Sequence, residues 1–69
     1  MLTDNQLDAL IENLKKEGIS YKFIANICDI PISTFYFYRR SRHYPIDVRL
    51  QIKDALYDRF GDMIDELSK

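Results

Sequence analysis

The sequence predicts an all-α fold, with five short helices in one domain that covers residues 1–69. Apolar residues recur at spacings of three and four in several segments, which is the period of an amphipathic helix. Residues that start and stop helices separate these segments. No stretch of the 69-residue chain has the pattern of a credible strand, so we expect helices throughout.

The first helix is expected between Thr3 and Gly18. Thr3 and Gln6 have the spacing of a capping box, and Leu2 and Leu7 have that of a hydrophobic staple. Gly18 suits the position after the helix, where a left-handed backbone is common. We interpret this helix as a structural support whose charged residues form a solvated face. Its apolar stripe consists of Leu7, Leu10, Ile11 and Leu14.

Two further helices joined by a tight turn are expected between about residues 20 and 40. Ser20 is a favourable N-cap for the first of them, and its inward residues are expected to be Phe23, Ile24 and Ile27. Asp29 lies in the turn, where the backbone needs a left-handed residue and Asp is tolerated better than most. Pro31 fits the first turn of the next helix, where its missing N–H would be unpaired anyway. This pattern is a helix-turn-helix motif, whose second helix can enter the major groove of DNA.

A fourth helix is expected from Pro45 to Gly61, and Asp62 is expected to cap a short fifth helix. Leu50 and Tyr57 lie off the core stripe of the fourth helix. They either pack on the last helix or form part of a dimer seam, and the sequence leaves both possibilities open. The core stripe of the fourth helix is Val48, Ile52, Ala55, Leu56 and Phe60, and the fifth helix carries Met63, Ile64 and Leu67.

The positive charge is concentrated in the middle of the chain, although the net charge of the whole chain is −1. Residues 20–53 carry six basic and two acidic side chains, which gives a net charge of +4. Residues 1–19 sum to −2 and residues 54–69 to −3. A protein that meets phosphates on one side needs its positive charge concentrated there, and a basic middle segment between acidic ends fits this requirement.

Composition excludes several other classes of protein. Cys28 is the only cysteine, so no intrachain disulfide can form, which fits a reducing compartment. One His and one Cys cannot build a closed metal site, and we expect neither a metal nor a cofactor. No apolar run approaches the roughly 20 residues that span a bilayer, and the N-terminus lacks the features of a signal peptide. We therefore expect a soluble cytoplasmic protein with no membrane partner.

An enzyme is not expected either. A chain of this size buries only about 60% of its unfolded surface and has no room for both a core and a cleft built from several loops. The sequence offers no arguable carboxylate pair or nucleophile–base arrangement, and His43 is the only histidine. The acidic residues follow the spacing of solvent-facing helix positions.

The segment from Ser20 to Pro45 resembles the helix-turn-helix of the phage repressor and Cro family, the lambda-repressor-like DNA-binding domains. The flanking helices also match, so the resemblance covers nearly the whole chain. In style it is similar to the very small regulators of phages and prophages of Gram-positive bacteria. The corresponding positions are the cap Ser20, the pair Ile24 and Ala25, the turn residue Ile30, and the inward residues Phe35 and Tyr38. The chain departs from the family pattern at Asp29, Pro31, Arg39 and Ser41.

The resemblance implies a transcriptional regulator that binds double-stranded DNA as a homodimer, in the bacterial cytoplasm and at the nucleoid. The recognition helix would be about residues 32–40 of this sequence. The family places its base-edge contacts at the positions of Ile32, Ser33, Tyr36 and Phe37. Candidates for phosphate contacts are Lys22, Thr34, Arg40, Arg42 and His43, with Arg49 and Lys53 more distant.

The base-contact set lacks the Gln, Asn, Arg and Lys side chains that make bidentate contacts with adenine or guanine. Tyr36 and Phe37 therefore have three interpretations, which are packing within the domain, DNA contacts and a protein-binding surface. The alternative function is accordingly a helix-turn-helix scaffold that binds and inhibits a host protein. Anti-CRISPR proteins and other small phage-encoded inhibitors include some that resemble repressor domains in this way.

Overall fold

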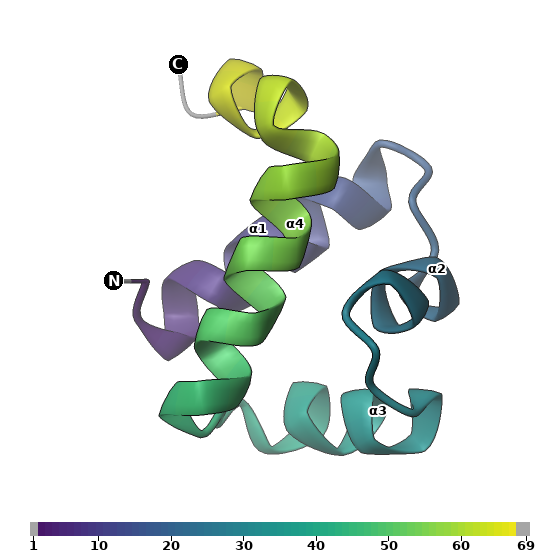
Figure 1. Cartoon of the computed structure of the whole chain (residues 1–69), viewed down its shortest axis with the longest axis vertical. Coiled ribbons are helices and arrows are strands. Elements are labelled where there is room, and N and C mark those ends of the chain that lie inside the picture. The colour runs from purple at the N-terminus through teal and green to yellow at the C-terminus, as the bar shows by residue number, and fades with distance from the viewer. Residues whose placement is uncertain (1, 68–69) are drawn as a thin grey trace.

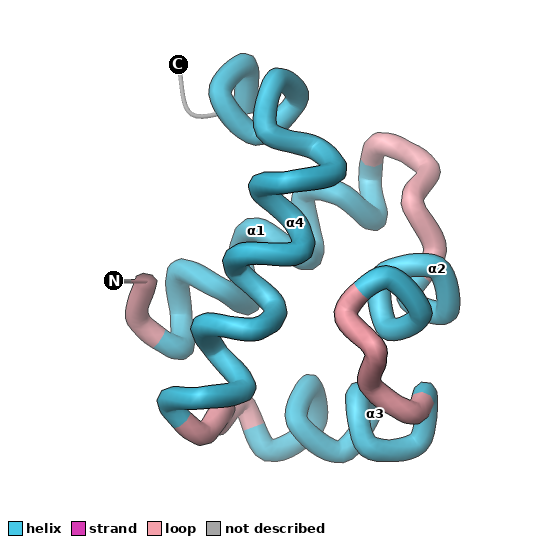
Figure 2. Tube along the Cα trace, in the orientation of Figure 1, coloured by secondary structure: helices cyan, strands magenta, loops and turns pink. Residues whose placement is uncertain are grey.

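The computed structural model describes residues 2–67, which form four helices connected by short loops (Figure 1). The helices are α1 (Asp4–Lys16), α2 (Tyr21–Ile27), α3 (Ile32–Ser41) and α4 (Ile46–Leu67). The described residues contain no strand (Figure 2), so the all-α prediction is confirmed. α4 packs against α1 and α2, and α3 packs against α2. None of the helices in this part of the chain combines the length and the apolarity that a bilayer span requires.

One hydrophobic core draws on all four helices. The connecting segments add Cys28, Ile30 and Tyr44 to it. The buried residues of α1 and α4 belong to the stripes expected for them, because the spacing of apolar residues selects the buried face of a helix. The helical members, each at most 2% exposed, are Leu7, Ile11 and Leu14 of α1, Ile24 and Ala25 of α2, Phe35 of α3, and Ile52, Leu56 and Ile64 of α4.

Phe23 does not point inward as expected, since its side chain is 38% exposed. Its ring centre lies 6.1 Å from that of Phe60 and 5.5 Å from the guanidinium carbon of Arg59. α2 has only seven residues, and Ile24 and Ala25 are the ones it buries fully. Phe23 therefore stays at the margin between α2 and α4.

Both ends of α1 follow local sequence rules. The Thr3 hydroxyl accepts a hydrogen bond from the Gln6 backbone N–H, and the Gln6 side-chain oxygen accepts one from the Thr3 N–H. At the other end Gly18 has a φ of +95°, and the Ile19 N–H donates to the Leu14 carbonyl at 3.0 Å. This is a Schellman ending. The predicted capping box and glycine stop are confirmed.

α2 ends in the same way as α1, with Asp29 in the position that glycine occupies after α1. Asp29 has a φ of +58°, and the Ile30 N–H donates to the Ala25 carbonyl at 3.0 Å. The left-handed backbone predicted for Asp29 is confirmed. Ile30 packs into the core beneath the turn. From α4, the Gln51 side-chain N–H donates to the Cys28 carbonyl at 2.6 Å and holds the turn in place.

The expected fourth and fifth helices lie in one element, α4, so residues 2–67 form four elements rather than five, but two helical segments meet at a kink within α4. The backbone of Phe60 leaves helical geometry, with φ of −125° and ψ of 24°, and the helix then resumes. The kink lies one residue before Gly61, close to the predicted break, and no loop separates the two helical segments. Ile64, beyond the kink, is 2% exposed in the core, and tertiary burial of this kind sustains a helix. The side chain of Leu67 lies outside the described residues.

We expect Asp29→Gly to stabilise the protein by about 0.5–1 kcal/mol, because glycine adopts a left-handed backbone without the steric penalty that a Cβ imposes. The same change at Asp58, an exposed position inside α4, should destabilise the protein by about 1 kcal/mol. Urea denaturation followed by circular dichroism measures both free energies of unfolding. Equal destabilisation by the two changes would contradict this account of the turn.

Candidate nucleic-acid interface

α3 lies across one end of the molecule and exposes one side (Figure 1). The exposed fraction is 49% for Tyr36 and 56% for Phe37, and Ser33 is also exposed. Ile32 lies at the margin of this surface with 36% exposed, whereas Phe35 is fully buried. The four base-contact candidates are therefore all accessible. We call the surface formed by Ile32, Ser33, Tyr36 and Phe37 the α3 face.

Packing within the domain accounts for only part of the two exposed rings. Tyr36 meets the Tyr21 ring edge-on, with ring centres 6.0 Å apart and an interplanar angle of 88°. The Phe37 ring centre lies 5.9 Å from that of Tyr38, which is half-buried. Tyr21 and Tyr36 also line an open hollow with Arg40. These contacts orient both rings but leave about half of each free to meet a partner.

The phosphate candidates differ in their accessibility. Thr34 is half-buried on α3. His43 has a side chain that is 72% exposed, and its Nδ1 lies 3.4 Å from the carboxylate of Asp4. Among the phosphate candidates, Lys22, Arg40 and Arg42 are exposed and have no carboxylate within 4 Å in residues 2–67. These three retain their full charge for an anionic partner.

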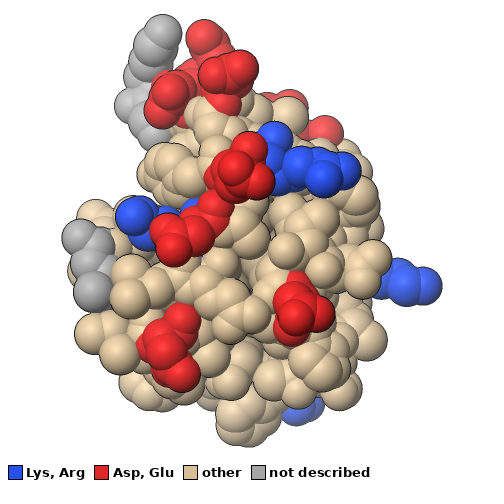
Figure 3. Space-filling view, in the orientation of Figure 1, with Lys and Arg blue, Asp and Glu red and all other residues tan. Residues whose placement is uncertain are grey.

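The more distant phosphate candidates are engaged elsewhere. Arg49 donates to the Asp4 carboxylate at 2.9 Å and to the Tyr44 carbonyl at 3.2 Å. The ammonium nitrogen of Lys53 lies 5.8 Å from the ring centre of Tyr57. Acidic side chains are spread over α4 and its C-terminal end (Figure 3). The side of the molecule that presents α4 is therefore unsuited to a phosphate backbone.

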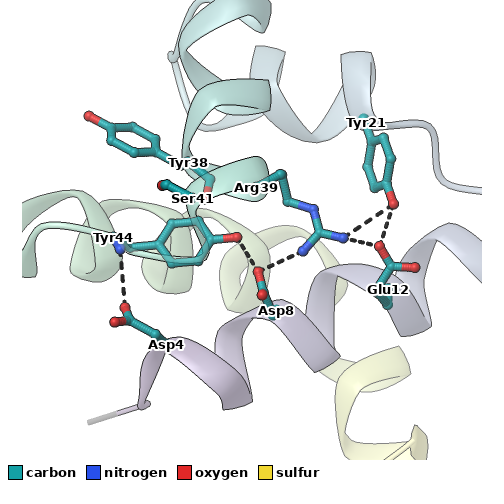
Figure 4. A network of polar contacts seen from close by, with 8 residues as sticks. All are labelled: Asp4, Asp8, Glu12, Tyr21, Tyr38, Arg39, Ser41 and Tyr44. Atoms are coloured by element: carbon teal, nitrogen blue, oxygen red, sulfur yellow. Dashed lines mark hydrogen bonds and ion pairs between the residues drawn. The ribbon is translucent and has the colours of Figure 1, made fainter.

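A polar network fastens α3 to α1 (Figure 4). Arg39 of α3 donates to Asp8 at 2.6 Å, to Glu12, and to the Tyr21 hydroxyl at 3.3 Å. The Tyr21 hydroxyl also donates to Glu12, and the Tyr44 hydroxyl donates to Asp8. The Arg39 and Asp8 side chains are each 15% exposed. The Arg39–Asp8 ion pair is therefore largely shielded from solvent, which strengthens it, whereas Glu12 is 45% exposed and its pair is weakened by solvent.

The expectation that the charged side chains of α1 form a solvated face holds for Lys15 and Lys16, which are exposed, and is wrong for the three acidic residues. Asp4, Asp8 and Glu12 follow one another at intervals of four residues, which aligns them along one side of the helix. That side meets Arg39 of α3 and Arg49 of α4. The spacing is visible in the sequence and could have pointed to this network. It does not indicate which distant cations will lie opposite the carboxylates.

Burial and polar contacts change the pKa values of three groups. Burial raises the pKa of the Cys28 thiol to about 11, so this thiol is protonated and unreactive at neutral pH. Burial also raises the pKa of the Tyr44 hydroxyl. At Asp4, desolvation raises the pKa, but the hydrogen bond from the Tyr44 N–H and the charges of Arg49 and His43 outweigh it. The pKa of Asp4 is therefore lowered from its usual value.

Comparison with known proteins leaves the chain without a match, since no family model, no curated protein and no solved structure is significantly similar to it. Within residues 2–67, no three His, Cys, Asp or Glu side chains are placed to hold a metal ion. The functional assignment therefore rests on the α3 face and its surroundings.

Arg39→Ala should destabilise the protein by about 2 kcal/mol, because it leaves the shielded carboxylate of Asp8 without its cation, while the partly exposed Glu12 adds little. Arg40→Ala is the matched control, since Arg40 is the next residue and is exposed. It should change the free energy of unfolding by less than about 0.5 kcal/mol. Chemical denaturation measures both, and similar small effects would show that the network contributes little to stability.

The stability of the protein should fall on acidification partly because of Asp4. Its folded-state pKa is lowered, so its contribution is present above the unfolded-state pKa of about 4 and is lost as the pH falls through the folded-state value. Asp4→Asn should therefore lose less stability below about pH 4 than the wild type. Melting temperatures from neutral to acidic pH test this, with Asp58→Asn as the control. Identical acid profiles for Asp4→Asn and the wild type would contradict the assignment.

Proposed function

We propose that this protein is a sequence-specific DNA-binding transcriptional regulator of the phage and prophage type, with a lambda-repressor-like fold. The observation that carries the proposal is the α3 face. It is an exposed helix surface on a two-helix unit joined by a tight turn, and the exposed Lys22, Arg40 and Arg42 lie on or beside the same two helices. A helix presented in this way suits the major groove. The protein would act as a homodimer in the bacterial cytoplasm, at the nucleoid, with one α3 helix per half-site.

The construction of the two-helix unit supports this function. Recognition of bases requires a helix held at a fixed angle, because side chains must reach base edges within hydrogen-bonding distance. Here α3 is fixed by the buried Phe35, by the Arg39 network to α1 and by the turn at Asp29. Pro31 precedes the helix as its N-cap and makes no side-chain capping hydrogen bond. The tertiary contacts of Phe35 and Arg39, rather than a capping hydrogen bond at its N-terminus, therefore position the helix.

In the DNA-binding function, the residues of the α3 face and the exposed cations would have different roles. On the α3 face, Ser33 can hydrogen-bond to several bases, and Ile32 and Phe37 can pack on thymine methyl groups. The cations Lys22, Arg40 and Arg42 would contact phosphates, with Thr34 and His43 beside them. Each phosphate contact adds about −0.9 to the slope of log affinity against log salt concentration. Affinity should therefore depend steeply on salt even where base recognition is apolar.

A second candidate function is a protein-binding inhibitor of a host protein, and the half-exposed rings of Tyr36 and Phe37 favour it. Aromatic residues beside an arginine are typical of protein-binding hot spots. No side chain of the α3 face makes the bidentate contacts that most strongly discriminate bases. In this function Arg40 and Arg42 would lie at the rim, where charges contribute little to affinity.

Substitutions at the two groups of residues distinguish the two functions. In the DNA-binding function, Arg40→Ala with Arg42→Ala should reduce DNA affinity at least tenfold and lower the salt slope by about 2. Tyr36→Ala with Phe37→Ala should remove sequence preference more than general affinity. Arg59→Ala, on α4, is the matched control and should bind as the wild type. Mobility-shift titrations on sites selected from a random DNA library measure these effects.

Failure of the wild type to bind DNA at low salt would overturn the first function. Affinity that does not change with salt would also contradict it, since the phosphate contacts would then be absent. The second function predicts a host-protein complex that survives the double arginine change and is lost with the double aromatic change.

A further inference from the structure

A hollow of about 500 Å³ opens beside the α3 face, where α3 meets the start of α2. It is lined by Tyr21 of α2 and by Tyr36, Arg39 and Arg40 of α3. Sites for small ligands commonly occupy roughly 300–1,000 Å³ and combine aromatic walls with a few polar groups. The hollow therefore has the size and the lining to hold one planar ring with a charged group attached to it.

The Tyr21 and Tyr36 rings meet at an interplanar angle of 88° and form a corner in the hollow. Tyr21 is held in place, since its hydroxyl donates to Glu12 (Figure 4). The ammonium nitrogen of Lys15 and the guanidinium carbon of Arg39 also lie 5.1 and 5.3 Å from its ring centre. Tyr36, in contrast, is 49% exposed. A half-accessible ring that packs against a fixed neighbour is a platform on which another planar ring can stack.

Arg40 gives the hollow a positive charge that no nearby carboxylate compensates. Arg39 also lines the hollow, but its guanidinium is paired with Asp8 and Glu12. Arg40 is exposed and has no carboxylate within 4 Å in residues 2–67. The ligand that fits best therefore combines a planar ring with an anion, as a nucleotide does with its base and its phosphate.

Two further uncompensated cations are close in sequence to the residues that line the hollow. Lys22 follows Tyr21 directly, and Arg42 comes two residues after Arg40. Both are exposed and, within the described residues, have no carboxylate within 4 Å. A strand with a phosphate at every nucleotide can meet all three cations, whereas a protein segment would need several acidic side chains at matching positions. This charge complementarity favours a nucleic acid as the occupant.

The Tyr36 platform favours an unpaired strand over a duplex. In a duplex the face of each base is covered by its neighbours in the stack, and only the base edges reach the grooves. In a single strand the faces are open, and aromatic side chains stack on them. Every base has such a face, so binding of this kind tolerates many sequences.

We propose that this protein binds single-stranded nucleic acid, with one base stacked on Tyr36 in the hollow and the adjoining phosphate paired with Arg40. Lys22 and Arg42 would meet phosphates further along the strand. This activity goes beyond the proposed recognition of duplex DNA and does not rest on it. Either activity can fail without the other, because a duplex exposes no base face along its length and a single strand has no groove. Since Tyr36 also belongs to the α3 face, the two ligands would compete.

Fluorescence anisotropy with labelled oligomers tests the proposal. The probes are an oligothymidylate of about 12 nucleotides and an abasic oligomer with the same number of phosphates. The wild type should bind the oligothymidylate about tenfold more tightly, since only this probe has bases to stack. Tyr36→Ala should abolish that difference by weakening the binding of the oligothymidylate alone. Tyr57→Ala is the matched control, since Tyr57 is a tyrosine of similar exposure on α4, and should bind as the wild type.

Two further measurements separate the charge contribution and the type of strand. Arg40→Ala should weaken the binding of both probes and lower the slope of log affinity against log salt concentration by about 0.7. Oligodeoxyuridylate and oligouridylate differ only in the 2′-hydroxyl, so a comparison of their affinities distinguishes DNA from RNA as the strand that is bound.

Tryptophan in place of Tyr36 reports the stacking directly, because the chain contains no tryptophan of its own. The fluorescence of Tyr36→Trp should be quenched by the oligothymidylate and not by the abasic oligomer, whereas neither probe should affect Tyr57→Trp. Both variants place a large ring where a tyrosine is already exposed, so they should fold, as circular dichroism would verify.

Equal affinity of the wild type for the two probes would overturn the proposal, and this is the result expected if the hollow receives a side chain of a protein partner. Failure to bind the oligothymidylate at low salt would also overturn it. So would equal quenching of Tyr36→Trp and Tyr57→Trp, since the strand would then have no preference for the hollow.

Discussion

The ion pairs of Arg39 with Asp8 and Glu12 determine how α3 is presented, and the candidate interface depends on them. Arg39 and Phe35 are four residues apart and therefore lie on one side of α3. One is anchored in the hydrophobic core and the other in the carboxylates of α1. With two anchors on the same side, the helix cannot rotate about its axis. Tyr36, Phe37 and Arg40 are consequently held outward.

The same network reduces the positive charge that the middle of the chain can offer to a partner. Two of the six basic residues between 20 and 53, Arg39 and Arg49, neutralise carboxylates of α1. They stabilise the packing of the helices and are not available to a nucleic acid. The cations that remain are fewer, and two of them, Arg40 and Arg42, lie in and just after α3. A net charge along the sequence is thus a poor measure of the charge that a partner meets, because pairing inside the fold removes part of it.

The features that depend only on neighbouring residues in the sequence were predicted correctly. The cap at Thr3, the stop at Gly18 and the left-handed Asp29 each depend on residues within one turn of helix. The break predicted near Gly61 is present as a kink at Phe60 between two helical segments, without the loop that would make them separate elements, and core burial of Ile64 holds the second segment in place. Phe23 was misplaced for a similar reason, as periodicity alone does not say how wide the buried face of a seven-residue helix will be.

The sequence by itself determined the helical class, the apolar stripes and the tight turn, since these depend on spacing and backbone preference. It also divided the aromatic run, placing Phe35 inward and Tyr36 and Phe37 outward. Only the tertiary structure decided which charges pair and that Tyr44 is buried. Arg39 meets Asp8 across 31 residues and Arg49 meets Asp4 across 45. Such contacts exist only after α1 has packed among the later helices, and no local pattern encodes which side chains will then face one another.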